Sequence, residues 1–343
     1  MANRKEKKQA SHAELVALDF GASGLKALRL RRYRDQVHLL GADILAPIQI
    51  DRDAPPDRAC RLTLPAPVQA KYAAIALNTP HTRVRLLAMP TASDGPSVEK
   101  QLREQMALED GDRLGMLPVS VEPGRPPSRV LVASLPEKEI QLVLGLTSSG
   151  PPAPCSLQPA GIATFNAFQE GPGKRLGNDA AMLIETGSHS TFVYCVHRGI
   201  PVLVRRHDQG AESIVHHLHQ QLGVDRDLAL TVLSDGAVDV TAAFHQAMGP
   251  LFKQLCIARD FVERQESCAV RHLFVSGGMS RSRLWREALA ELLSLPASTW
   301  DPLDMLTRVP GSYPERLHGE EWRFAAAVGV GLGALERDAH VHA

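Results

Sequence analysis

Residues 14–30 read ELVALDFGASGLKALRL. Apolar runs flank a Gly-Ala-Ser-Gly break at 21–24, a pattern that predicts two strands joined by a tight hairpin. Residues 180–199, AAMLIETGSHSTFVYCVHRG, repeat the arrangement of apolar strand, acidic residue, x-Gly, small polar residues and second strand. Residues 18–21 (LDFG) align with residues 184–187 (IETG). We interpret the repeat as an internal duplication, which predicts two similar lobes.

The segment between the two hairpins predicts an inserted α/β subdomain. A partial apolar face among charges at 97–109 predicts a helix, and residues 118–136 predict strand, proline-rich loop, strand. A second helix is expected at 138–150, and the PPAP at 151–154 ends the subdomain. Before the subdomain, apolar runs predict three strands at 37–45, 71–78 and 82–90.

After the second hairpin, the pattern predicts a strand at 200–206 and a helix at 210–223. A long helical region follows at 237–265, interrupted near Gly249-Pro250. Residues 271–293 predict a strand, a Gly-Gly turn and a helix. The expected parts are a disordered basic tail at 1–12, a first lobe at 13–87, an inserted subdomain at 88–157, a helix returning to the first lobe at 158–178, a second lobe at 179–323, and a C-terminal helix and tail at 324–343.

The composition narrows the range of functions. The chain has 343 residues with 38 basic and 38 acidic side chains, so its formal net charge is zero. This balance gives no electrostatic case for a nucleic-acid partner, because such binding depends on clustered basic side chains. The five cysteines are scattered and form no C-x-x-C pair, which favours a reducing, cytoplasmic compartment. Residues 1–12 do not read as a signal peptide, and no run of about 18 apolar residues predicts a membrane span.

The first hairpin, residues 19–26, has the residue types that a phosphate site needs. Successive backbone N–H groups in a tight glycine turn form a concavity for phosphate oxygens. Lys26 adds a positive charge, Ser23 adds a hydroxyl, and Asp19 is expected to act through a hydrated Mg²⁺. The alternative is a plain glycine hairpin, and the motif is not a Walker loop. The candidate residues are Asp19, Gly21, Ala22, Ser23, Gly24 and Lys26.

Two further motifs complete the candidate site. The second hairpin, residues 185–191, offers similar geometry and is expected to face the first across a cleft. At 276–280, a strand that ends in Gly-Gly would let a flat ring approach the backbone closely. The alternative there is a helix N-terminus capped by Ser280 or Ser282. The candidate residues are Glu185, Gly187, Ser188, Ser190, Thr191, Gly277, Gly278 and Met279.

The order of these motifs resembles the actin, Hsp70 and sugar-kinase superfamily. This implies a two-lobed actin-like α/β fold of the ribonuclease H-like type, with duplicated lobes. Within the superfamily the chain most resembles PilM, the cytoplasmic actin-like family of type IV pilus assembly, and more distantly FtsA. LVALDFGASGLKALRL resembles the PilM opening, and LFVSGGMSRSRLWREALAELL resembles its adenosine-side segment. The resemblance spans residues 14–337 and is weakest at 48–70 and 296–322.

The resemblance to PilM implies ATP and Mg²⁺ bound between the two lobes. It also implies a groove beside the inserted subdomain that holds the short cytoplasmic N-terminus of PilN, an inner-membrane pilus protein. Contact with the membrane would then be indirect, with the protein cytoplasmic and peripheral to the inner membrane. On this basis we expect a scaffold with at most weak ATPase activity, and a homo-oligomer is left open.

The chain departs from the PilM pattern at two points. The acidic residue of the second hairpin is usually Asp in the family and is Glu185 here, one methylene longer. A carboxylate that positions a ligand is sensitive to a displacement of about 1 Å. The family usually shows Ala-Glu-x-x-Lys, whose Glu and Lys side chains contact the ribose and the base. The corresponding stretch here runs from Ala229 to Leu233 and has neither the Glu nor the Lys. We therefore expect weak or lost nucleotide binding.

Two alternative functions stay open on the sequence. A sugar or acid kinase would use the same cleft and needs a base near the second hairpin. Asp179 and Asp208 are the nearby candidates, and neither lies in a recognisable motif. An FtsA-like filament protein would instead associate with copies of itself.

Overall fold

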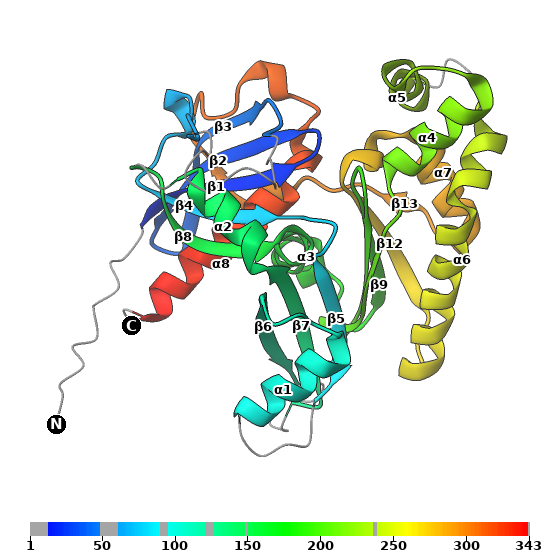
Figure 1. Cartoon of the computed structure of the whole chain (residues 1–343), viewed down its shortest axis with the longest axis horizontal. Helices are drawn as coiled ribbons and strands as arrows, with labels where there is room; N and C mark the ends of the chain where they lie inside the picture. Colours follow the sequence, from blue (N-terminus) through cyan, green and yellow to red (C-terminus); the bar gives the residue numbers. More distant parts are fainter. Residues whose placement is uncertain are drawn as a thin grey trace.

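The structure is a computed structural model that describes residues 13–48, 61–89, 95–120, 127–147, 150–235 and 239–341. Two lobes lie side by side in Figure 1, and a smaller subdomain lies below them. The tail expected at 1–12 falls outside the described residues. Within them, no helix combines the length and the apolarity that crossing a membrane requires.

The first lobe is built on a six-stranded sheet in the order β14-β3-β2-β1-β4-β8. β1 pairs antiparallel with β2 and parallel with β4. Six consecutive residues of β1 are buried, as expected for a central strand covered on both faces. The strands are β1 (Glu14–Gly21), β2 (Gly24–Tyr33), β3 (Gln36–Leu45), β4 (Tyr72–Leu77), β8 (Ala153–Pro159) and β14 (Thr307–Arg308).

The second lobe repeats this arrangement in a five-stranded sheet with the order β11-β10-β9-β12-β13. Its first strand, β9, pairs antiparallel with β10 and parallel with β12, as β1 does with β2 and β4. The duplication predicted from the two hairpins is therefore confirmed. The strands are β9 (Ala180–Thr186), β10 (Thr191–His197), β11 (Ile200–His207), β12 (Val270–Ser276) and β13 (Ala297–Ser298).

The inserted subdomain is a three-stranded antiparallel sheet in the order β5-β7-β6 with two helices. The helix α1 buries Leu102 and Met106 against Val130 and Val132 of the central strand, which forms a small separate core. The elements are β5 (Arg83–Ala88), α1 (Gly95–Met106), β6 (Asp112–Val119), β7 (Arg129–Pro136) and α2 (Glu137–Gly145).

Two helices pack against each other at the centre of the molecule. α3 (Ala160–Glu170) and α8 (Ala325–Val341) cross closely, and α8 also lies against β1, β2 and β4. On its other side, α3 contributes Phe165 and Phe168 to a core shared with the second sheet. Figure 1 shows α8 under the first lobe, although it comes last in the chain.

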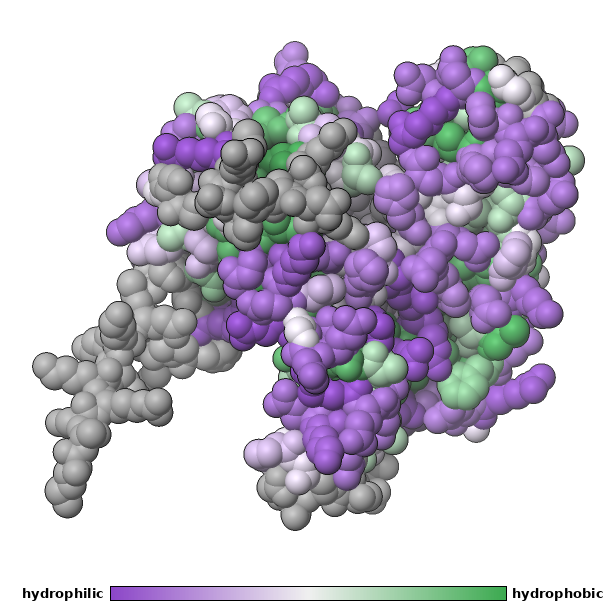
Figure 2. All heavy atoms as spheres, in the orientation of Figure 1, coloured by the Kyte–Doolittle hydropathy of each residue, from purple (hydrophilic) through white to green (hydrophobic). Residues whose placement is uncertain are grey.

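Four helices cover the outer face of the second lobe, the longest of which, α6, runs down the side of the molecule. Their apolar faces and the sheet form one core around Phe244, Leu255 and Trp285. Figure 2 shows a mostly hydrophilic face with only small hydrophobic patches. These helices are α4 (Ala211–Leu222), α5 (Arg226–Asp235), α6 (Thr241–Glu266) and α7 (Arg283–Leu293); short 3-10 helices are η2 (Ala66–Val68), η3 (Pro172–Arg175), η4 (Gly278–Arg281), η5 (Pro302–Met305), η6 (Glu315–Leu317) and η7 (Glu321–Phe324).

Three boundaries differ from those predicted. β5 was expected in the first lobe but pairs with β7 in the inserted sheet. β8 was expected in the inserted subdomain but pairs with β4 in the first lobe. It is an edge strand, and proline is tolerated there because its missing N–H breaks no hydrogen bond to a neighbouring strand. β14 was expected in the second lobe but pairs with β3 of the first lobe.

The predicted interruption at Gly249-Pro250 is also wrong, because α6 is continuous from Thr241 to Glu266. Pro250 is exposed, and its ring costs one backbone hydrogen bond and about 3 kcal/mol. The buried face of the helix offsets that cost. Its residues include Phe244, Met248, Leu251, Phe252 and Leu255.

Candidate phosphate-binding cleft

A small cavity of about 130 Å³ opens where the two hairpins and the Gly-Gly turn meet. It brings together ten of the residues predicted from the sequence. Four of the predicted residues lie outside its lining: Gly24, Ser190, Thr191 and Met279. The predicted lining residues are Asp19, Gly21, Ala22, Ser23, Lys26, Glu185, Gly187, Ser188, Gly277 and Gly278.

The first hairpin is a tight turn in which Gly21 pairs with Gly24. Gly24 has a φ of +139°, a conformation that favours glycine, and a Cβ there would lie 2.8 Å from the Leu45 carbonyl oxygen. A Cβ on Gly21 would lie 2.2 Å from the Lys26 Nζ atom. The lysine ammonium therefore occupies the space that this glycine leaves open, next to the turn.

Asp19 and Lys26 face each other across the β1–β2 pair. The Lys26 Nζ atom is 3.3 Å from Asp19 Oδ2, and the two side chains are only 9% and 10% exposed. The ion pair balances the charge of both groups inside the cleft. Asp19 is thus already paired with a cation of its own chain.

Glu185 lies on the other side of the cleft and is partly buried. Thr164 of α3 donates a hydrogen bond of 3.0 Å to Glu185 Oε1, while Oε2 is buried without a hydrogen-bond partner. Burial, and then the nearby charge of Asp19, raise the pKa of Glu185 to about 8. At neutral pH the carboxyl is therefore mainly protonated.

The second hairpin is held by the N-terminus of α4. Gly187 N–H donates to the Ser190 carbonyl over 3.0 Å, and the N–H groups of Ala211 and Glu212 donate to the carbonyls of Gly187 and Ser188. The first N–H groups of the helix are therefore used on the hairpin itself. The two predicted residues of this hairpin that lie outside the cavity lining have structural partners. Ser190 accepts a hydrogen bond from Asn78, and Thr191 donates one to the Gln209 carbonyl.

Packing requires a glycine at the first position of the Gly-Gly turn. Gly277 has a φ of +79°, and a Cβ there would lie 2.5 Å from the Thr186 carbonyl oxygen. Gly278 has no atom within 4 Å of such a Cβ and leaves open space in the cavity lining. Met279 is 5% exposed and packs in the second lobe's core, as does Leu233 from the stretch that lacks the family's polar pair.

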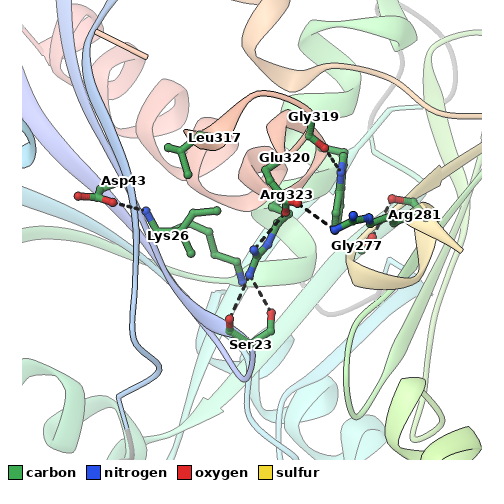
Figure 3. Close-up of polar contacts among 12 residues, drawn as sticks. Ser23, Lys26, Asp43, Gly277, Arg281, Leu317, Gly319, Glu320 and Arg323 are labelled. Carbon is green, nitrogen blue, oxygen red and sulfur yellow. Dashed lines mark hydrogen bonds and ion pairs between the residues drawn. The ribbon is translucent and has the colours of Figure 1, made fainter. Parts of the chain in front are cut away.

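Sequence reasoning missed Arg323, which comes from the segment before α8. Its Nη2 atom donates to the Ser23 carbonyl oxygen at 3.0 Å and to Ser23 Oγ at 3.3 Å. Its Nη1 atom donates to Glu320, which also accepts from Arg281 of the second lobe at 3.1 Å. Figure 3 shows this chain of contacts from the first hairpin to the segment after Gly277. Trp322, beside Arg323, also lines the cavity.

The two candidate bases for a kinase do not line the cleft. Asp179 is hydrogen-bonded to His272 at 3.1 Å. Asp208 is paired with Arg206, and its side chain is 80% exposed. Neither belongs to the cavity lining, so the described cleft offers neither as an acceptor for a substrate proton.

A divalent cation fits this donor set poorly. Mg²⁺ prefers charged oxygen ligands, yet Asp19 is paired with Lys26 and Glu185 is mainly uncharged at neutral pH. Within the residues that the structure describes, no group of three or more His, Cys, Asp or Glu side chains is placed to hold a metal ion. The role of Asp19 toward Mg²⁺ therefore stays a prediction from the sequence.

Two adjoining cavities form a groove where the first lobe meets α2 of the inserted subdomain. They measure about 270 and 320 Å³ and share Glu139 and Leu142. We call them the α2 groove. Its inner part is mainly apolar and its outer part carries both signs of charge. The inner lining includes Phe20, Leu25, Ile48, Leu77 and Pro80, and the outer lining includes His81, Arg83, Glu109, Asp112 and Lys138.

No protein-family model matches the chain, and no curated protein sequence matches it either. The fold is similar to a chain of the solved PilM-PilN type IV pilus biogenesis complex, with a TM-score of 0.74 and 17% identity over 94% of this chain and 98% of that one. The protein therefore has the two-lobed, PilM-like fold of the actin-like class that the motif order predicts.

More distant likenesses include an actin-like ATPase fold protein from Bacteroides thetaiotaomicron, with a TM-score of 0.48 and 10% identity over 86% of this chain and 95% of that one. MreB 5 of Spiroplasma citri bound to AMPPNP gives a TM-score of 0.49 and 8% identity over 97% of this chain and all of that one.

Proposed function

We propose that this protein is a PilM-like adaptor of a type IV pilus or related secretion platform. In this proposal it holds the cytoplasmic N-terminus of a PilN-like inner-membrane protein and stays peripheral to the membrane through that partner. The similarity to the PilM-PilN complex over nearly the whole length of both chains supports the proposal. The observation in this chain that carries it is the α2 groove.

The groove has the chemistry of a peptide site. Phe20, Leu77 and Leu142 give its inner part an apolar lining that suits one or two buried peptide side chains. The outer part presents Arg83 and Lys138 beside Asp112, so it suits a polar or charged continuation of the peptide. A short extended segment that enters from the outer part would place its apolar residues against the first hairpin.

Under the same proposal, the cleft between the lobes binds ATP weakly and does not hydrolyse it rapidly. The partly buried Glu185, one methylene longer than the usual Asp, and the missing polar pair near Leu230 and Leu233 support weak binding. Neither carboxyl group in the cleft lining is suited to act as a general base for phosphoryl transfer, since Asp19 is ion-paired and Glu185 is mainly protonated. In this proposal the groove binds the partner peptide, and the cleft binds nucleotide only weakly.

Calorimetric titration of the full chain with a synthetic peptide tests the adaptor function. The peptide has the sequence of the cytoplasmic N-terminus of the PilN-like protein from the same genome, and saturable 1:1 binding is expected. Leu142→Ala should weaken binding about tenfold or more, because it removes apolar contact area from the groove.

The matched control is Leu233→Ala. Leu142 and Leu233 are 5% and 6% exposed, so both substitutions remove a similar buried side chain, but Leu233 lies in the second lobe's core. Thermal unfolding checks that the two variants lose similar stability. Equal peptide affinities for the two variants would contradict the groove assignment. Phosphoryl transfer from ATP to a small substrate would favour the kinase alternative.

A further inference from the structure

We propose that the cleft binds a phosphate chain without a divalent cation, held by Lys26, Arg323 and a hydrogen bond from the Glu185 carboxyl. The inference rests on the proposed function only in assigning the cleft to phosphate. It differs from the expectation for Mg²⁺·ATP because the counter-charges come from this chain's own side chains.

Lys26 is the first of these groups. Its side chain is 9% exposed, it lines the cavity, and its ammonium lies over Gly21 in the first hairpin. An ammonium has three donors, and the contact with Asp19 at 3.3 Å uses one of them. The remaining donors are available to a phosphate oxygen beside the turn.

Arg323 is the second group, on the same side of the cavity. Its guanidinium holds the Ser23 carbonyl and hydroxyl and is 19% exposed. A guanidinium has five N–H donors, and the contacts with Ser23 and Glu320 use three of them, so donors remain for a phosphate oxygen. Its ion pair with Glu320 fixes it at the mouth of the cleft, so little side-chain entropy remains to be lost on binding.

The charges of the named side chains favour an anion. Three cations, Lys26, Arg281 and Arg323, are set against two charged carboxylates, Asp19 and Glu320. This surplus of positive charge suits a bare phosphate chain. A magnesium ion would add two more positive charges to a site with no uncompensated carboxylate.

Glu185 supplies a neutral donor opposite the cations. Its Oε2 atom is buried, has no hydrogen-bond partner and belongs to a residue that lines the cavity. The groups that face it are Asp19, Lys26, Thr164 and the buried Tyr194. Because burial keeps the carboxyl protonated at pH 7, it can donate to a phosphate oxygen instead of repelling it.

The size of the cavity agrees with this ligand class. Its volume of about 130 Å³ is several times the roughly 30 Å³ share of one water molecule. The cavity therefore has room for a phosphate chain.

Calorimetry of the full chain at pH 7 tests the proposal with pyrophosphate, ADP and ATP, each in EDTA and in excess Mg²⁺. Binding in EDTA is expected, with an affinity at least equal to that in Mg²⁺. Binding that requires Mg²⁺, or no binding of any of the three anions, would overturn it. If ADP and ATP bind more tightly than pyrophosphate, the natural ligand is a nucleotide; equal affinities point to inorganic polyphosphate.

Three substitutions make the test specific. Asp19→Asn removes a negative charge and should tighten pyrophosphate binding roughly threefold or more, whereas a magnesium site would lose affinity. Arg323→Gln should weaken it about tenfold, a loss typical of a single charge-assisted contact. Glu185→Gln should retain binding in EDTA because the amide is also a neutral donor. Weaker pyrophosphate binding by Asp19→Asn, or unchanged pyrophosphate binding by Arg323→Gln, would contradict the assignment.

Arg226→Gln is the matched control for Arg323→Gln, because Arg226 is also ion-paired to a glutamate but lies on α5, outside the cavity lining. The peptide titration is also run on the wild-type chain. If the wild type binds the peptide but none of the three anions, this inference is refuted and the adaptor function stands. Intact phosphate binding with no peptide binding refutes the adaptor function and leaves this inference standing.

Discussion

At the scale of single residues, Glu185 defines the character of the cleft. Burial removes water from its carboxyl, and Asp19 disfavours a second negative charge nearby; both raise the pKa, to about 8. The hydrogen bond from Thr164 and the charge of Lys26 act in the opposite direction and are smaller. The cleft therefore has one charged carboxylate at neutral pH where the sequence offers two.

Glu185→Gln should reduce the dependence of stability on pH. The folded wild type holds the Glu185 proton more tightly than the unfolded chain does, so its free energy of unfolding falls as pH rises from about 4.5 to about 8. For one group the slope is at most about 1.4 kcal/mol per pH unit. Chemical denaturation at pH 5, 6.5 and 8 measures it. Parallel profiles for wild type and variant would show that Glu185 does not carry this proton.

Residues of the cleft differ in how far the sequence could predict them. Asp19, Lys26 and Glu185 lie in short local patterns at the end of a strand, where residue type and spacing are informative. Arg323 lies 300 positions from its partner Ser23, and no local pattern links the two. Thr164 was missed for the same reason, since its hydrogen bond to Glu185 exists only because α3 packs beside β9.

At the scale of elements, the crossing of α3 and α8 depends on a glycine. A Cβ on Gly329 would lie 1.7 Å from the Ala163 carbonyl oxygen, so the two helices could not approach this closely with any other residue. A Cβ on Gly333, four residues further along the same helix, would lie 3.3 Å from the end of the Gln158 side chain, which can move.

Gly329→Ala should therefore destabilise the protein by about 3 kcal/mol, at the upper end for overpacking of a core, because backbone atoms must shift. Gly333→Ala is the control and should change stability by less than about 1 kcal/mol, since a gain in helix propensity offsets the small displacement. Urea denaturation compares the two variants. Equal losses would mean that the helices do not cross as the structure has them.

Most elements could be predicted because their apolar patterns are local, and the exceptions have physical reasons. β8 was missed because prolines at both ends of the segment disguise an edge strand. The two-residue strand β14 has no pattern of its own and exists through its pairing with β3. Pro250 does not interrupt α6, because the buried face of this helix is long enough to offset one lost hydrogen bond.

At the scale of the whole molecule, the cleft and the α2 groove meet at the first hairpin. Phe20, Gly21, Ala22, Asn78 and His189 line both the phosphate cavity and the inner part of the groove. A phosphate chain on one side of the turn and a peptide on the other would therefore contact the same few residues. Under the proposed function, any effect of one ligand on the affinity for the other must be reciprocal.

Hydrogen exchange of the full chain, with and without saturating partner peptide, shows where the peptide binds. If the α2 groove is the peptide site, exchange should slow in α2 and in the connection at 77–83, which line it. Exchange in α6, on the outer side of the second lobe, should stay unchanged. Saturable peptide binding with no protection at the groove, or with protection confined to the second lobe, would contradict the account.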